Sequence, residues 1–177
     1  MTASQTPGDV TVDVVFPVDG QTLPRDHAQA LQQALCAQMP WLGTETLAGV
    51  QPIKLVPGGD EPALLSRRAR LLLRVGAQRM DELMALAGLD LSVDGHRLRL
   101  GAPHKRELQP HATLYAYKVA ADSADEVAFM ATVRRELDTL GIGGERVCGK
   151  RQRMVISGRV LDTFSLMLHA LPEEQSL

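Results

Sequence analysis

His27 is the residue whose type and position best suit acid–base chemistry. It lies beyond Val10–Val18, a run that alternates like a strand, and just after Pro24, a residue typical of a first helical turn. Histidine titrates near neutral pH, and the N-terminus of a helix attracts phosphate. His27 could therefore exchange a proton at a phosphate ester. A surface or half-buried histidine without a catalytic role would look the same in the sequence.

The other four histidines are weaker candidates, because an ordinary structural role explains each of them equally well. His96 lies in a hairpin strand, His104 in a basic loop with the sequence HKR, His111 ahead of a strand, and His169 within one. Of these, the loop at His104 could contact a phosphate backbone.

Arginine and lysine gather in two blocks, although the chain as a whole carries a net charge of −2. Residues 64–106 hold nine basic and four acidic side chains, and residues 146–159 hold five basic and none acidic. Binding depends on the local field at a face and not on the total charge. The blocks indicate an anionic ligand, although solvated strand edges that block edge-to-edge pairing would have the same composition.

Several common chemistries have no counterpart in the sequence. It contains no GxxxxGK[ST], HExxH, CxxC or GxSxG motif, and its two cysteines lie far apart. We therefore expect no cofactor, no metal site and no disulfide framework. The six aromatic residues are too few for a stacking platform of the RRM type, so RNA would have to be held by its backbone and helical shape.

The elements that must position these residues follow a βαββαβ order in the first part of the chain. Strands are predicted at 10–18, 50–56 and 66–75, and helices from Pro24 to Met39 and at 78–87. A hairpin over 91–100 turns at Asp94–Gly95. This is the order of a ferredoxin-like unit.

The same order begins again after residue 112. A strand is predicted at 113–119, a helix at 124–140 that ends at Gly141, two strands at 145–148 and 153–156 joined by a basic turn, and a further strand at 163–170. The last residues indicate a first helical turn. The predicted fold class is α+β, with tandem ferredoxin-like domains at 1–108 and 109–177, the second incomplete at its C-terminus because no room is left for a final strand.

The sequence shows no signal for export or for a membrane. No apolar run approaches the roughly 18–20 residues that span a bilayer, and the first twenty residues lack the basic and apolar regions of a signal peptide. We expect a cytoplasmic protein without a membrane partner.

Several segments of this sequence resemble the CRISPR-associated endoribonucleases that process precursor crRNA, specifically the MYXAN-type subfamily. The resemblance is carried by FPVDGQTLPRDHAQALQQAL (16–35), PWL (40–42), SRRARLLLRV (66–75), LAGLDLSVDGHRLRLGAP (86–103) and LQPHATLYA (108–116), with a looser match over 133–158. LPxDHxxAL and DGHRLRLG are its most specific parts.

The resemblance implies tandem ferredoxin-like domains and metal-independent cleavage of a repeat stem-loop, in which a 2′-hydroxyl attacks the adjacent phosphate and leaves a 2′,3′-cyclic phosphate. It implies that His27 is the catalytic acid–base residue. Arg25, Lys150 and Arg151 are candidates for stabilising charge in the transition state. Candidate RNA-binding residues are Arg67, Arg68, Arg70, Arg97, Arg99, His104, Lys105, Arg106 and Arg153.

The partners expected from this resemblance are the repeat stem-loop of precursor crRNA and subunits of a CRISPR effector complex. Two other interpretations stay open. The chain could be a non-catalytic crRNA-binding subunit, because the family's final helix and glycine-rich loop would lie beyond Leu177. It could also be a ferredoxin-like small-molecule sensor whose arginines are merely solvated.

Overall fold

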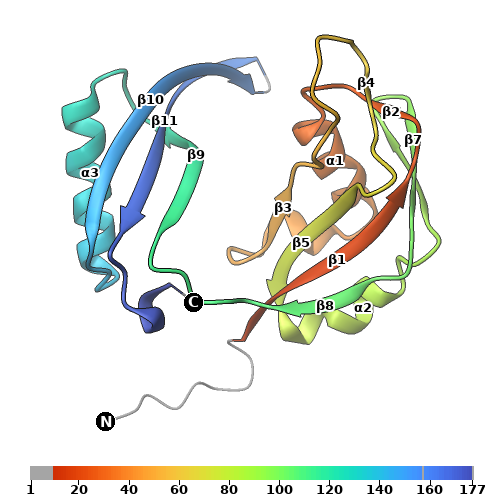
Figure 1. Ribbon diagram of the computed structural model, residues 1–177, viewed down its shortest axis with the longest axis horizontal. Helices are drawn as coiled ribbons and strands as arrows, with labels where there is room; N and C mark the ends of the chain where they lie inside the picture. Colours follow the sequence, from red (N-terminus) through yellow and green to blue (C-terminus); the bar gives the residue numbers. More distant parts are fainter. Residues whose placement is uncertain (1–9, 157, 177) are drawn as a thin grey trace. The chain divides into compact units, whose positions relative to one another are not determined.

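The chain forms two compact units that divide between Leu108 and Gln109. The computed structural model describes residues 10–156 and 158–176 (Figure 1). We call the unit before the division unit 1 and the one after it unit 2, and describe each by itself. Within the described residues, no helix has both the length and the apolar character to cross a lipid bilayer.

Unit 1 is built on a six-stranded sheet with β1 at its centre. The strand order is β3-β5-β1-β7-β6, with β8 also paired to β1 and with all the pairs antiparallel. The strands are β1 (Thr11–Asp19), β3 (Gly49–Gln51), β5 (Arg70–Gly76), β6 (Asp90–Val93), β7 (His96–Leu100) and β8 (His104–Glu107). Two short strands, β2 (Thr22–Leu23) and β4 (Ala63–Leu64), pair separately.

One edge of β1 is shared by two partners. Val18 and Asp19 pair with β7, whereas residues 12–15 pair with β8. Between these two ladders, the N–H of Gly101 donates a hydrogen bond of 2.7 Å to the carbonyl of Pro17. The edge of β1 therefore contains a seam at Pro17, where one partner strand ends and the next begins.

The alternation of β1 explains which face of the sheet is buried. Val12, Val14 and Phe16 point to one side and are almost fully buried. Helix α1 (Ala28–Gln38) packs Leu31 and Leu35 into the same core, and α2 (Met80–Met84) follows a 3₁₀ turn (Ala77–Arg79) and adds Leu83. Complete burial of each such side chain contributes roughly 1.5–3 kcal/mol. The opposite face of β1 and β5 carries the charged residues Asp13 and Arg74 beside the apolar pair Val15 and Leu72.

Unit 2 has the order β9 (Leu114–Ala121), α3 (Glu126–Thr139), β10 (Glu145–Ile156) and β11 (Arg159–His169). The sheet order is β10-β11-β9, and α3 lies along one face of it (Figure 1). Phe129 and Val133 of α3 pack against Phe164 and Leu166 of β11, with the two phenylalanine rings stacked at 4.7 Å. A 3₁₀ turn (Glu173–Gln175) follows β11. Unit 1 contains a similar 3₁₀ turn after α1, at Pro40–Gly43.

The structure confirms the ferredoxin-like order of unit 1 and corrects four details. The strand predicted at 50–56 is shorter than expected, since β3 covers only Gly49–Gln51. The HKR segment is part of strand β8 and not a loop, because it pairs with β1. Helix α1 begins at Ala28, because Thr22 and Leu23 pair with β4. The predicted second helix is shorter than expected, since only Met80–Met84 is α-helical.

Unit 2 begins as predicted with β, α and β elements, and its helix ends near Gly141, which has a φ of 70° that favours glycine. The prediction of a basic turn after Cys148 was wrong. Residues 145–156 form one strand, β10, and its register against β11 shifts between Cys148 and Arg151. Two residues of β10, Gly149 and Lys150, lie opposite Ser165, so the one extra residue forms a β-bulge instead of a turn.

Candidate nucleic-acid interface

His27 is the N-terminal cap residue of α1 and is 3% exposed. Its Nδ1 lies 2.9 Å from the carbonyl oxygen of Pro24, and the backbone N–H of Ile53 donates to Nε2 over 3.0 Å. A carbonyl can only accept and an N–H can only donate, so these partners assign a neutral ring with its proton on Nδ1. Both ring nitrogens are thus bonded to backbone in this conformation, and the expected acid–base role stays a prediction.

Arg25 lies close to His27 in sequence but binds a different segment. Its Nε donates to the carbonyl of Asp60 over 3.0 Å, and its backbone N–H lies 3.2 Å from each carboxylate oxygen of Glu61. These bonds hold the start of α1 against the segment between β3 and β4. The expected role of Arg25 at a phosphate stays a prediction.

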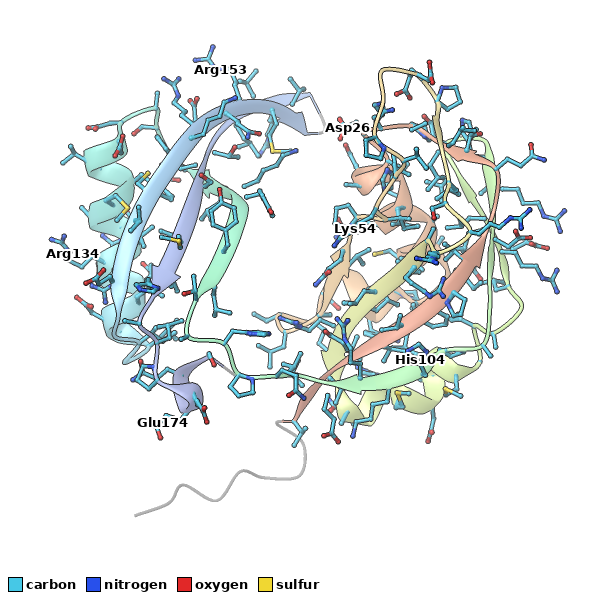
Figure 2. The ribbon with its side chains drawn as sticks, viewed as in Figure 1. Asp26, Lys54, His104, Arg134, Arg153 and Glu174 are labelled. Carbon is cyan, nitrogen blue, oxygen red and sulfur yellow. The ribbon has the colours of Figure 1, made fainter. Side chains whose placement is uncertain are left out.

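A cavity of about 570 Å³ opens on the face of β1 and β5 that α1 does not cover. Val15 and Leu72 contribute apolar lining. Four basic side chains and no acidic one line it: Lys54, Arg68, Arg70 and Arg106. Figure 2 shows Lys54 on the segment that follows β3. We call this the basic cavity.

Three of the four cations of the basic cavity lack a carboxylate partner. Arg70 donates to the carbonyl of Ala69 over 2.8 Å, and no described residue forms an ion pair with Lys54, Arg68 or Arg70. Arg67 points elsewhere, since it lines a separate cavity of about 390 Å³ together with Arg99. The structure therefore brings three of the expected RNA-binding arginines, Arg68, Arg70 and Arg106, together with Lys54, which the sequence reasoning missed.

Asp13 is the second residue that the sequence reasoning missed. It lies on β1 opposite Arg74 of β5 and Arg106 of β8, and it is 2% exposed. Arg74 donates to both carboxylate oxygens at 2.9 and 3.3 Å, and Arg106 donates at 2.8 Å. Burial alone would raise the pKa of Asp13, but the hydrogen bonds and charges of the two guanidinium groups outweigh it and lower the pKa.

The remaining expected residues of β8 face solvent. His104 and Lys105 are exposed, and Lys105 lies 3.4 Å from Glu107. Figure 2 labels His104 near the start of β8. An exposed pair of this kind contributes little to stability, so these side chains are free to meet an anion.

The hairpin of β6 and β7 carries the arginines of the DGHRLRLG segment. Arg97 binds Asp90 through two hydrogen bonds of 3.1 and 2.9 Å, and Arg99 lies 3.5 Å from the same carboxylate. The hydrogen bonds from Arg97 are the main cause that lowers the pKa of Asp90, and the positive charges of Arg97 and Arg99 lower it further, whereas desolvation acts in the opposite direction. His96 Nδ1 lies 2.9 Å from the hydroxyl of Thr22. We call the adjoining hollow, of about 480 Å³, the hairpin groove.

Unit 2 repeats the combination of one aspartate with two arginines. On β11, Asp162 lies 2.9 Å from Arg151 and 3.6 Å from Arg153, both on β10. The hydrogen bond from Arg151 is the main cause that lowers the pKa of Asp162. Figure 2 shows Arg153 pointing outward from β10. Lys150 lies at the β-bulge and has no ion pair with a described residue.

Two histidines of unit 2 make only local bonds. His169 Nδ1 lies 2.8 Å from the hydroxyl of Thr113, and the backbone N–H of His111 donates to Ser176 over 3.0 Å. Among the residues that the structure describes, no group of three or more His, Cys, Asp or Glu side chains is placed to hold a metal ion.

The sequence matches the protein family described as Cas6 Crispr over residues 12–177. The chain belongs to the Cas6 family. It is 36% identical over 169 residues to the CRISPR-associated endonuclease Cas6 of Myxococcus xanthus (strain DK1622), an alignment that covers 95% of this chain and 73% of that protein. The resemblance read from LPxDHxxAL and DGHRLRLG is confirmed.

Solved Cas6 structures share the fold of this Cas6-family chain at low sequence identity. A CRISPR-associated Cas6 protein superposes with a TM-score of 0.58 and 9% identity, covering 93% of this chain and 90% of the other. A Cas6-related protein from Pyrococcus furiosus gives a TM-score of 0.51 and 8% identity, with coverages of 94% and 89%. The tandem ferredoxin-like class is therefore confirmed.

In this Cas6-family chain, the sequence contains a signal for one of the two missed residues, Asp13, and none for the other, Lys54. Asp13 is a lone acid in a valine-rich strand, which is an unusual place for a charge without a partner. Its partners lie 61 and 93 residues away, so only the strand pairing reveals them. Lys54 lies between Ile53 and Leu55, in a segment bounded by Pro52 and Pro57. Nothing in this local sequence indicates a role for it.

Proposed function

We propose that this chain binds the stem-loop of a CRISPR repeat in precursor crRNA and cleaves it without a metal ion to release mature crRNA. The observation that carries the proposal is the Cas6 family match over residues 12–177. As a member of this family, the chain is a CRISPR-associated endoribonuclease that processes precursor crRNA. The acid-free basic cavity supports it, because arginine binds phosphate bidentately.

The proposed reaction is an internal transesterification. A base takes the proton of the 2′-hydroxyl, its oxygen forms a bond to the adjacent phosphorus, and the bond from phosphorus to the 5′-oxygen breaks. An acid returns a proton to that 5′-oxygen. The products are a 2′,3′-cyclic phosphate and a 5′-hydroxyl, and cationic side chains stabilise the phosphorane in between.

His27 is our candidate for one of the two proton transfers, and its geometry sets a condition. Nε2 can meet the RNA only when the N–H of Ile53 releases it, because that N–H occupies its lone pair. Ile53 lies in the segment between β3 and β4. We propose that RNA binding shifts this segment and frees Nε2, with Nδ1–H still held by Pro24. Arg25, two residues ahead of His27, is the proposed nearby cation in unit 1.

Two further parts of the proposal concern the surroundings of the enzyme. The chain would keep its product and pass it to subunits of a CRISPR effector complex, and it would act in the cytoplasm. Lys150 and Arg151 of unit 2 would supply additional positive charge to the bound RNA. The exposed position of Lys150, without an ion pair to any described residue, supports this role.

The test is cleavage of labelled repeat RNA by the purified chain in excess EDTA. The expected result is a single cut that persists in EDTA, ends in a cyclic phosphate and disappears when the attacking 2′-hydroxyl is replaced by hydrogen. Binding without a cut would contradict the enzymatic part and favour a crRNA-binding subunit. Neither binding nor cutting would overturn the whole proposal.

A pair of variants tests His27 separately from folding. Gln at position 27 places an amide oxygen near the position of Nε2, where it can accept from Ile53, but it cannot exchange a proton. We expect His27→Gln to lower the cleavage rate at least 100-fold with RNA affinity within threefold. His27→Ala should also lose thermal stability, because it removes the partner of the buried Ile53 N–H and of the partly buried Pro24 carbonyl. Full activity of His27→Gln would contradict the assignment.

A further inference from the structure

The chain has two tyrosines, and both are exposed on the same strand. Tyr115 and Tyr117 of β9 are 52% and 74% exposed. Their ring centroids are 4.6 Å apart with an angle of 75° between the planes, so the edge of one ring meets the face of the other. Neither phenol oxygen has a hydrogen-bond partner among the described residues. Two large aromatic side chains are thus held together but not buried.

The pair lies on the face of the unit 2 sheet that α3 leaves uncovered. Leu166 and Leu168 of β11 pack toward α3, so Met167 between them points to the other side. Tyr115 is paired with Met167, which is paired in turn with Val147 of β10. Tyr115 therefore shares the open face with Met167 and Val147. The contact between the two rings places Tyr117 there as well.

Two lysines flank the pair at irregularities of the sheet. The register of β9 against β11 shifts opposite Ser165, where Tyr117 and Lys118 lie, and that of β10 shifts at Gly149 and Lys150. Neither lysine forms an ion pair with a described residue. The exposed aromatic pair is therefore accompanied by two uncompensated positive charges.

This combination matches the chemistry of unpaired nucleotides. Bases of single-stranded RNA stack on exposed tyrosine rings of a sheet, and lysines beside them meet the phosphates. Bases inside a stem are already stacked on each other and cannot use such rings. Six aromatic residues are few for a platform of the RRM type, but their number says nothing about their position, and the fold brings both tyrosines to one face.

We propose that Tyr115 and Tyr117 form a base-stacking platform for one or two unpaired nucleotides next to the repeat stem, with Lys118 and Lys150 contacting their phosphates. This rests on the proposed binding of repeat RNA and adds to it a second subsite, on unit 2, for single-stranded RNA. Tyr117, as the more exposed ring, makes the larger contact.

The direct test uses ¹⁹F NMR of the chain labelled with 3-fluorotyrosine. Two tyrosines give two resonances, which Tyr115→Phe and Tyr117→Phe assign. The probe is repeat RNA with unpaired flanks on both sides of the stem and a 2′-deoxy substitution at the cut site. Saturating RNA should shift the Tyr117 resonance, and an otherwise identical RNA with abasic flanks should not.

Affinity measurements supply the second arm. Tyr115→Leu/Tyr117→Leu should weaken binding of the flanked RNA by about tenfold or more, because each stacked base contributes appreciably. The two phenylalanine variants should stay within twofold, since they keep the ring. Binding of the isolated stem-loop should not change. Val127→Ala is the matched control, because Val127 is 78% exposed on α3.

Four outcomes would overturn the platform. They are unshifted resonances at saturation, equal shifts with abasic flanks, unchanged affinity of the double leucine variant, and shifts that depend on protein concentration without RNA. The last would indicate association between copies of the chain. If wild-type chain still binds and cuts the repeat, only the platform has failed. If it neither binds nor cuts, the proposed function itself has failed.

Discussion

The basic cavity and the hairpin groove of unit 1 both contain expected RNA-binding arginines, but they differ in the acids that accompany them. Lys54, Arg68 and Arg70 in the cavity meet no carboxylate among the described residues. In the hairpin groove, Arg97 and Arg99 share Asp90, and Asp19 is also in the lining. Similar charge density along the sequence therefore gives different fields at the surface.

This difference predicts which surface dominates RNA affinity. A phosphate that approaches the hairpin groove competes with Asp90 for the arginines, whereas one that approaches the basic cavity displaces only water and counterions. We expect the basic cavity to contribute most of the salt-dependent affinity of unit 1.

The largest effect should follow from removing the three cations of the basic cavity that have no carboxylate partner among the described residues. Lys54→Ala/Arg68→Ala/Arg70→Ala should weaken repeat RNA binding about 10- to 100-fold and reduce the slope of log affinity against log salt by about two. Filter binding at four salt concentrations measures both. Arg134→Ala/Arg135→Ala on α3 is the control, since these exposed arginines belong to the other unit. An unchanged salt slope in the triple variant would show that the basic cavity does not contribute most of the salt-dependent affinity of unit 1.

The next effect concerns Asp13, the acid beneath Arg106 at the margin of the basic cavity. Asp13→Asn removes the charge that two guanidinium groups bind and should lower the free energy of unfolding by about 1–2 kcal/mol. The loss is smaller than for a fully buried ion pair, because the arginine side chains are 45% and 55% exposed and regain water. Urea unfolding at pH 7 measures it, with Asp90→Asn as the exposed counterpart that should change stability less.

The pH dependence of Asp13 gives a sharper version of the same test. Its pKa is lower in the folded chain than the unfolded value of about 3.9, so the unfolded chain takes up the proton first as the pH falls. The contribution of Asp13 is thus complete above about pH 5 and is lost below about pH 4. The difference in stability between wild type and Asp13→Asn should follow this course. A difference that stayed constant down to pH 3 would show that the charge of Asp13 is irrelevant.

The smallest effects are expected at the hairpin groove. Arg97→Ala/Arg99→Ala should weaken RNA binding less than threefold, because Asp90 already neutralises part of their charge. Asp90→Asn should strengthen binding about two- to threefold by releasing both arginines. Weaker binding of Asp90→Asn would reverse this interpretation and show that Asp90 orients the arginines for RNA.

The sequence predicted those parts of the fold that depend on local pattern. Alternating valines indicated β1, helical spacing of Leu31 and Leu35 indicated α1, and Asp94–Gly95 indicated a tight turn. Strand β8 was missed because its four residues are all exposed, so it has no apolar alternation. The β-bulge in β10 was mistaken for a turn, because a glycine beside charged residues is typical of both.

The candidate site was less predictable, because it depends on residues distant in sequence. The motif around His27 identified the family, but the bond from Ile53 to its ring comes from a segment 26 residues away. The ion pairs of Asp13 and the pairing of Tyr115 with Met167 likewise follow from strand register. Composition correctly indicated an anionic partner but could not distinguish compensated from uncompensated arginines.

The seam along β1 gives Pro17 a specific effect on the pairing of the sheet. Proline is normally excluded from central strands because it has no N–H to donate. In an antiparallel strand the N–H and C=O of one residue point to the same edge, and the carbonyl of Pro17 meets Gly101 at the seam. The missing donor therefore falls where β8 has ended and β7 has not begun. Neither strand can slide along β1 across this point without facing a position that cannot donate, so Pro17 fixes the register of both.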